Sequence, residues 1–471
     1  MGPGAVLRRW SRGLVLAVPA VLALPVLAAP PALAAASCDG RTATVVGSGA
    51  INGTAGNDVI VGSGEKDTIN GRGGNDRICG LAGADTITDG PGDDHVLAGG
   101  GADTFLQGAS ADGADVLEGN AGADTVSYAS RTAPVTVTLA ASDPDGGTAE
   151  GDVVYSTERV TGGSSTDHLS GTQGADVLRG GAGNDVLDAL GGADVLQGDA
   201  GDDHENGGLG QDAFDQGTAA DGTDTLDGGG FDPGAVDLVD YSGRTGDVTL
   251  FGAVGSGEVG EGDTITGEIE DFRLGGGNDT AFGNSLANAI DGGPGNDDLQ
   301  GRSGNDTLTG GPGDDVLTGG LGFDALSTGD GADSVVIDFT TASNQEAVSD
   351  FAAGTDVVAC DMSAMAVGNG DTVVTSTVSA GIWSASAELF IDTSDLSSAT
   401  SASAVGAELS SASAAIPVGA RKILVADDGT SSGVWYFVSD GDADVEGSEL
   451  TLLAGLAATP TTGATDYAFI P

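Results

Sequence analysis

The chain has 471 residues and a formal net charge of −56, with 71 Asp and Glu against 15 Lys and Arg. Such a polyanion argues against nucleic acid and anionic membranes as partners, because both carry charge of the same sign. Aromatic residues make up only 4% of the chain, which is not typical of a globular enzyme of this length.

The N-terminal segment has the organisation of a secretory signal peptide. A basic stretch with Arg8, Arg9 and Arg12 precedes an apolar run and a series of small residues that ends at Ala36, which is the order found in signal peptides. Prolines within the apolar run argue against a stable membrane-spanning helix. We therefore predict a cleaved signal over residues 1–36, a secreted, extracellular protein, and no membrane span after signal cleavage.

A nine-residue unit, Gly-Gly-x-Gly-x-Asp-x-apolar-x, dominates the following sequence, as in GGAGNDVLD at 180–188 and GGPGDDVLT at 310–318. Positions one to six favour a turn, because glycine reaches positive φ without steric cost. Positions seven to nine favour a short strand whose middle residue points inward. The predicted inward residues of the first two runs are Ile60, Ile69, Ile78, Ile87, Val96, Phe105, Leu169, Leu178, Leu187, Leu196, Glu205 and Phe214.

Such short strands bury too little apolar surface alone, so stacked units must share one thin core. Two units per turn would place residues 18 apart above one another, at about the 4.8 Å spacing of paired strands. Glu205 interrupts the apolar series, and we expect it either to face solvent or to distort its strand.

The aspartate at position six makes each turn a candidate metal site. Stacked carboxylates repel one another unless a cation lies between them. Calcium accepts roughly six to eight oxygen ligands in flexible geometry, whereas magnesium needs a stricter octahedron and zinc prefers Cys or His. The sequence therefore predicts Ca²⁺, as multiple ions, as the cofactor. The candidate metal ligands are Asp58, Asp67, Asp76, Asp85, Asp94, Asp103, Asp167, Asp176, Asp185, Asp194, Asp203, Asp212, Asp279, Asp297, Asp306, Asp315, Asp324 and Asp333.

These units resemble the RTX (hemolysin-type) calcium-binding nonapeptide repeat, and the resemblance covers residues 53–336. It implies a parallel β-roll in which the position-six aspartates of successive turns bind Ca²⁺ between them. Carried over to this chain, it pairs Asp58 with Asp76 and Asp185 with Asp203, and so on along each run. Asn288 departs from the pattern, because it stands where the family has aspartate.

The repeats are organised in blocks, and the first two blocks each end in an extended loop and a β-rich insert. We predict an all-β fold, a parallel β-roll or β-helix solenoid in repeated blocks with a small β-rich C-terminal domain. Asp112, Asp115, Asp221 and Asp224 in the extended loops are candidates for further calcium ligands. The predicted boundaries are 1–36 for the signal peptide, 37–161 and 162–275 for the first two blocks with their inserts, 276–337 for the third block, and 338–471 for the C-terminal cap and domain.

Few residues outside the repeats have chemistry of their own. In a secreted chain, Cys38 and Cys79 can join the mature N-terminus to an early repeat by a disulfide, and two free thiols are the alternative. His95, His168 and His204 each follow a position-six aspartate, so we expect them to face outward rather than to form a metal or catalytic cluster.

Motifs of secreted hydrolases are missing from the sequence. Neither His-Glu-x-x-His nor Gly-x-Ser-x-Gly occurs, so we expect no enzyme. The predicted function is that of a secreted calcium-binding protein whose repeats fold into a β-roll on binding Ca²⁺. Two alternatives stay open: a calcium-stiffened adhesin or surface-matrix protein with a cell-surface or matrix partner, and a hydrolase with its site in residues 338–471.

Overall fold

The computed structural model describes residues 36–139, 146–147, 151–230, 233–251, 256–258, 261–338, 345–350 and 356–361, together with the strands β40 to β44 further on. None of the described residues forms a helix, and none therefore belongs to a helix that could cross a membrane. The predicted signal peptide, apart from residue 36, and much of the predicted C-terminal domain lie outside these residues.

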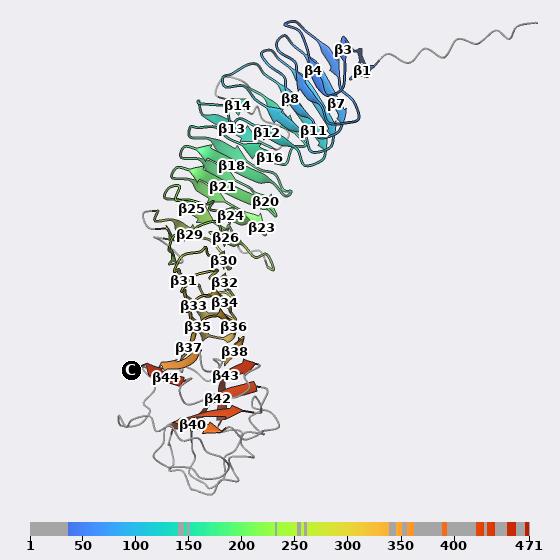
Figure 1. Cartoon of the computed structure of the whole chain (residues 1–471). Coiled ribbons are helices and arrows are strands. Elements are labelled where there is room, and N and C mark those ends of the chain that lie inside the picture. Colours follow the sequence, from blue (N-terminus) through green and yellow to red (C-terminus); the bar gives the residue numbers. More distant parts are fainter. Residues whose placement is uncertain are drawn as a thin grey trace, which may run out of the picture.

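The chain winds into a parallel β-solenoid with two strands per turn, as predicted (Figure 1). Successive units alternate between two faces, so that β5 (Val59–Val61) pairs with β7 (Arg77–Ala82) while β6 (Thr68–Asn70) pairs with β8 (Thr86–Thr88). The register aligns residues 18 apart, for example Ile60 with Ile78. The nine-residue period therefore sets both the strand length and the height of one turn.

One face is a single ladder of paired strands that continues across the predicted block boundaries. In order of pairing, its strands are β4 (Ala50–Asn52), β6, β8, β10 (Thr104–Leu106), β12 (Thr125–Ser127), β16 (Arg159–Thr161), β18 (Val177–Ala182), β21 (Val195–Ala200), β24 (Ala213–Asp215), β26 (Leu238–Asp240), β30 (Asp271–Arg273), β32 (Ala289–Asp291), β34 (Thr307–Pro312), β36 (Phe323–Asp330), β38 (Gln345–Ser349), β43 (Leu450–Ala457), β42 (Ser431–Val438), β41 (Arg421–Asp427) and β40 (Leu389–Asp392). The blocks thus form one continuous solenoid.

The other face consists of three successive sheets, because an insert enters at the end of each of the first two blocks. The first sheet holds β3 (Val45–Val46), β5, β7, β9 (His95–Gly100), β11 (Val116–Ala121) and β15 (Val153–Tyr155). The second holds β14 (Gly146–Gly147), β13 (Val135–Thr138), β17 (His168–Ser170), β19 (Val186–Asp188), β22 (His204–Asn206), β25 (Thr225–Asp227) and β29 (Thr264–Thr266). The third holds β28 (Gly257–Glu258), β27 (Val248–Leu250), β31 (Thr280–Phe282), β33 (Asp298–Ser303), β35 (Val316–Leu321), β37 (Ser334–Asp338), β39 (Val357–Asp361) and β44 (Tyr467–Ile470). Two short pairs, β1 (Ser37–Cys38) with β2 (Arg41–Thr42) and β20 (Gly191–Gly192) with β23 (Leu209–Gly210), lie outside both faces.

The core is the predicted column of inward residues, one per unit, and the apolar members are all buried. Glu205 contradicts the expectation for it, because its side chain is 0% exposed and β22 keeps its pairing with both neighbouring strands. Its Oε1 accepts a hydrogen bond of 3.0 Å from the Gly198 N–H, which gives the carboxylate a partner inside the solenoid. The prediction was wrong because a buried polar group with a hydrogen-bond partner does not need to leave the core.

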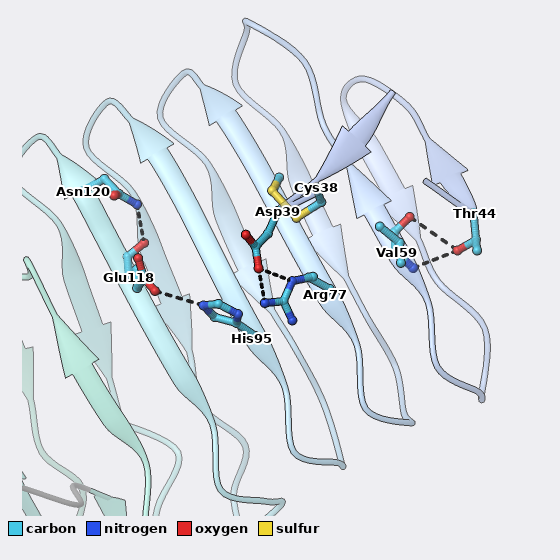
Figure 2. The surroundings of a disulfide bond; sticks show 9 residues. Cys38, Asp39, Thr44, Val59, Arg77, His95, Glu118 and Asn120 are labelled. Carbon is cyan, nitrogen blue, oxygen red and sulfur yellow. Dashed lines mark hydrogen bonds and ion pairs between the residues drawn. A yellow bond between two sulfur atoms is a disulfide. The ribbon is translucent and has the colours of Figure 1, made fainter. Parts of the chain in front are cut away.

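At the N-terminal end the structure shows a disulfide, one of the two alternatives that the sequence left open. Cys38 on β1 is bonded to Cys79 on β7, with a Cα–Cα distance of 5.6 Å. Figure 2 shows Asp39 beside this bond, turned toward Arg77, with which it forms an ion pair. Of the histidines, His168 and His204 are exposed as expected, whereas His95 is partly buried with its Nε2 at 2.9 Å from Glu118.

Candidate metal centres

The position-six aspartates form ladders along both edges of the solenoid. In each ladder, one carboxylate oxygen, Oδ1, accepts a hydrogen bond from the backbone N–H of the position-six residue one turn earlier. The Asp58 N–H lies 2.8 Å from Asp76 Oδ1, and the Asp167 N–H lies 2.7 Å from Asp185 Oδ1. Each side chain therefore ties two turns together through one of its oxygens.

The second oxygen of most ladder aspartates is buried without a hydrogen-bond partner in the described part of the chain. An unpaired buried acceptor is costly, and a buried charge more so, so these oxygens need a cation or a proton. The aspartates with such an Oδ2 are Asp76, Asp85, Asp94, Asp103, Asp115, Asp124, Asp185, Asp194, Asp203, Asp212, Asp297, Asp306, Asp315, Asp324 and Asp333.

Backbone oxygens lie beside these carboxylates because position one is glycine in most units. A Cβ placed on Gly310 would lie 2.5 Å from both Asp315 Oδ2 and the carbonyl oxygen of Thr328, which belongs to the next turn on that edge. The missing side chain thus leaves room where a carboxylate and a carbonyl oxygen converge. An all-oxygen donor set of this kind fits Ca²⁺ and lacks the nitrogen or sulfur that zinc prefers.

The first loops of each block are different, because their aspartates find partners within their own loop. Asp176 Oδ2 accepts hydrogen bonds from Thr172, 2.6 Å from the backbone nitrogen and 2.8 Å from the hydroxyl. Asp58 is bound in the same way by Thr54. The Oδ2 atoms of the other first-loop aspartates accept hydrogen bonds from position two, in the pairs Asp67–Ser63, Asp167–Gly163 and Asp279–Gly275.

The backbone at position two separates these two classes of loop. In the regular nine-residue loops with an unpaired Oδ2, the residue at position two has positive φ even where it is not glycine, as at Arg72 (78°), Leu190 (73°) and Arg302 (73°). Thr54 and Thr172, which bind their own aspartates, are not among the residues with positive φ. A left-handed non-glycine residue costs about 1–2 kcal/mol, and such strain clusters at ligand-binding positions.

Burial dominates the electrostatics of both classes, since it also raises the pKa of the first-loop residues Asp167, Asp176 and Asp279. Burial raises the pKa of Asp94 to about 7 and that of Asp185 to about 7, with repulsion from neighbouring carboxylates adding to the effect. By contrast, the backbone hydrogen bond from Thr54 lowers the pKa of Asp58. The ladder carboxylates therefore resist ionisation until a positive charge compensates them.

Arginine supplies a cation where the extended loops interrupt the ladders. Arg244 is 1% exposed and donates to Glu261 Oε1 at 2.6 Å, to Asp221 Oδ1 at 2.9 Å and to the Gln216 carbonyl at 2.8 Å. Arg131 lies 3.2 Å from Asp112 Oδ1 in the first block. Asp112 and Asp221, two of the further candidate calcium ligands, thus face a guanidinium.

The structure brings the predicted ladder residues together one turn apart, and it adds residues that the nine-residue period missed. Extended loops displace the next ladder carboxylate from the period, but it still accepts the N–H of the preceding turn. The only signal in the sequence was the similarity between the two extended loops. The added residues are Asp124, Asp152, Glu158, Asp237, Asp263 and Glu270.

Comparison with protein families agrees with this geometry. The model of the RTX calcium-binding nonapeptide repeat matches residues 52–87, 73–105, 110–129, 161–196, 184–214, 273–308, 291–326 and 309–336. No curated protein matches the chain. The matched segments hold the turns with the unpaired carboxylates, and one of them reaches the extended loop that carries Asp115 and Asp124.

Proposed function

Because this chain belongs to the RTX calcium-binding nonapeptide repeat family, we propose that it is a calcium-binding protein whose solenoid folds on ion binding. The observation that carries the proposal is the series of buried Oδ2 atoms without a partner in the described residues. A chain of this charge cannot bring those carboxylates together unless positive charge accompanies them.

The chain's own residues prepare each proposed site. Position-six carboxylates are held by the N–H of the preceding turn, so that Oδ1 is fixed and Oδ2 faces the glycine at position one. Carbonyl oxygens of the adjoining turn complete an oxygen-lined site. Bound Ca²⁺ would supply the positive charge that the ladder lacks. In the first loops, the Oδ2 atoms of aspartates such as Asp58 and Asp176 accept hydrogen bonds from their own loop, so these residues need no cation and begin each ladder.

Folding and ion binding can be measured on the same sample. Circular dichroism of the purified protein should show little β-structure in EDTA and a cooperative gain on titration with CaCl₂, whereas equal MgCl₂ should give a much smaller gain. Elemental analysis after gel filtration in calcium should show several ions per chain. A β-spectrum that is the same with and without EDTA, or protein free of calcium after gel filtration, would reject the proposal.

We further propose that the protein acts outside the cell and has no catalytic role. Proteins of this repeat family are typically secreted, and extracellular calcium at about 10⁻³ M fills sites with dissociation constants of about 10⁻⁴–10⁻³ M. N-terminal sequencing of protein recovered from the culture medium should begin close to Ser37. Activity of the purified protein toward esterase, protease or glycosidase substrates would contradict the non-catalytic part.

A second candidate role is a calcium-stiffened spacer in an adhesin or surface matrix. The single elongated stack of turns in Figure 1 favours it, because a solenoid separates its two ends by a length that grows with each repeat. In that case the protein should sediment with cells in calcium and be released by EDTA. Protein that stays in the medium at all calcium concentrations would leave simple calcium binding as the better description.

A further inference from the structure

Three buried carboxylates meet in the first block, and one of them does not belong to the ladder. Oxygens of Asp89, Asp94 and Asp115 all lie within 4.8 Å of one another. Asp94 and Asp115 are ladder residues, each with a buried and unpaired Oδ2. Asp89 stands at position one of its unit, where the pattern has glycine, so it adds a third carboxylate that the nine-residue repeat does not provide.

A buried amide accompanies this cluster. Gln107 is only 3% exposed, and its Nε2 lies 3.3 Å from Asp89 Oδ2. Its Oε1 has no hydrogen-bond partner among the described residues. A buried amide oxygen without a partner is rare in folded proteins, and here it belongs to a side chain that contacts the carboxylate cluster. The cluster therefore offers neutral as well as charged oxygen donors.

The second block has a related but looser arrangement: its third carboxylate comes from another residue, and among the described residues only the first-block trio has all its oxygens within 4.8 Å of one another. By position in the duplicated block, Asp203, Asp224 and Gln216 correspond to Asp94, Asp115 and Gln107. Gly198 stands at the position of Asp89, and Glu205 takes the place of the core residue Val96.

The Glu205 carboxylate contacts Gly198, the residue that corresponds to Asp89 of the first block. Its Oε1 accepts the N–H of Gly198, and the Gln216 side chain lies beside the carboxylate. Its Oε2 and the Gln216 Oε1 are both buried and unpaired among the described residues. Two different positions of the repeat thus bring a third carboxylate to one place beside an equivalent glutamine.

Neither side chain is explained by packing. Glu205 is paired with Leu187 on one side and Leu226 on the other, in a column that is otherwise apolar. A buried carboxylate in such surroundings is destabilising unless a positive charge or a proton compensates it. Both blocks contain such a destabilising buried carboxylate beside an equivalent glutamine. This indicates that the same kind of ligand compensates it in both.

We propose that each cluster is a divalent-cation site, one in each of the first two blocks, that binds calcium more tightly than the simple ladder sites. The inference rests on the proposed function, since it shares Asp94 and Asp115 in one block and Asp203 and Asp224 in the other. Three carboxylates and an amide oxygen suit Ca²⁺, and calcium affinity rises with the number of charged ligands. These sites fill first and nucleate the folding of their blocks.

The test is a competition titration of the full chain against a fluorescent calcium chelator. Wild-type protein should show a tight class of two ions, and Asp89→Asn and Glu205→Gln should each remove one of them. The double variant should have none, with affinity at these sites weakened roughly tenfold or more. The charge-matched controls are Asp93→Asn and Asp202→Asn, since these aspartates are exposed and adjoin ladder residues of the same two clusters.

The outcomes separate this inference from the proposed function. No calcium bound by the wild type defeats the proposed function, and the inference with it. Calcium binding that is equal in the wild type and the double variant defeats the inference alone. Dichroism in saturating calcium shows whether the variants fold. If the glutamine at position 205 prevents folding, Glu205→Val, which installs the residue found at the equivalent Val96, must also lose one tight ion. If the variants bind as many tight ions as the wild type and are more stable than it in EDTA, the inference is wrong, and protons rather than calcium compensate the charge of the clustered carboxylates.

Discussion

Substitution of a ladder aspartate by asparagine should have opposite effects with and without calcium. Asp185 Oδ1 accepts the Asp167 N–H at 2.7 Å, and asparagine can keep this bond. Its Oδ2 is buried and unpaired beside the Gly198 carbonyl oxygen. In Asp185→Asn an amide NH₂ takes the place of Oδ2 and can donate to that carbonyl. The substitution therefore removes an unpaired buried charge and adds a donor where a cation would otherwise be needed.

The magnitudes follow from the two states of the site. Without calcium, relief of the unpaired carboxylate oxygen should stabilise the fold by about 1–3 kcal/mol. With calcium at about 10 mM and a dissociation constant of about 10⁻⁴–10⁻³ M, loss of one ion should remove about 1.4–2.7 kcal/mol. Asp176→Asn is the matched control, because Thr172 already binds the Oδ2 of Asp176. Asp176→Asn should lower the free energy of unfolding by about 1–3 kcal/mol both with and without calcium.

Both conditions are accessible to dichroism. Urea unfolding measures stability in calcium, and titration with trimethylamine N-oxide in EDTA drives the calcium-free chain to fold. Asp185→Asn should unfold at lower urea than wild type in calcium, yet fold at lower osmolyte concentration in EDTA. Asp176→Asn should be less stable in both titrations. If Asp185→Asn lowered stability in both titrations, or raised it in both, the assignment of its Oδ2 as the group that needs a cation would be refuted.

Three further predictions address the other charged and covalent features. Arg244→Met leaves buried carboxylates without their cation, so it should lower the free energy of unfolding in calcium by about 3–5 kcal/mol. Arg273→Met, at an exposed ion pair, should change this free energy by less than about 1 kcal/mol. Urea unfolding of both variants and wild type measures the difference, and equal effects would contradict the role of Arg244. Replacing Cys38 and Cys79 by Ser, which removes a cross-link with a sequence separation of 41, should cost about 4 kcal/mol, and a stability equal to that of wild type would show that the bond does not restrain the unfolded chain. In EDTA, the folded state should become less stable as pH rises. Burial raises the pKa of Asp94 to about 7, above its value in the unfolded chain, so the stability present at about pH 4 is lost as pH rises through about 7. A dichroism signal for β-structure that increases with pH would contradict this.

Much of the fold follows from the period alone. Alternation of glycine turns and three-residue strands fixes two units per turn, and one inward apolar residue per unit fixes the core, as Ile60 above Ile78 illustrates. These features depend on local conformation and on repetition, and both can be read directly from one chain. For Cys38 and Cys79 the sequence left a disulfide and two free thiols open, and the structure shows the disulfide.

The division of the ladder aspartates into two classes could not be predicted in this way. Thr54, Ser63 and Thr172 at position two suggest a rule based on hydroxyl side chains, but Gly163 binds its aspartate through the backbone alone. What the first loops share is their place at the start of a ladder, where no regular loop precedes them. That is a property of the stack, and no single nine-residue unit contains it.

The ladder also predicts that a change at one turn affects the turn before it more than its own backbone amide. The Asp167 N–H donates to Asp185, whereas the N–H of Asp185 donates to Asp203, 2.7 Å away. Asp185→Ala therefore removes the partner of the Asp167 amide and leaves the partner of the amide at 185 in place. In saturating calcium, hydrogen exchange at Asp167 should accelerate by about ten- to a hundredfold, since a bond to a charged acceptor is lost.

Exchange at residue 185 itself should change much less, and Asp202→Ala, which alters an exposed neighbour of the ladder, should leave both amides protected. Equal acceleration at 167 and 185 would indicate that the whole block loosens as a unit, and that ion binding rather than the side-chain ladder holds successive turns together. A response confined to the turn before the substitution would mean that each carboxylate orders the loop beneath it. Each turn would then depend on the turn that follows it, so turns would form from the insert of each block toward its first loop.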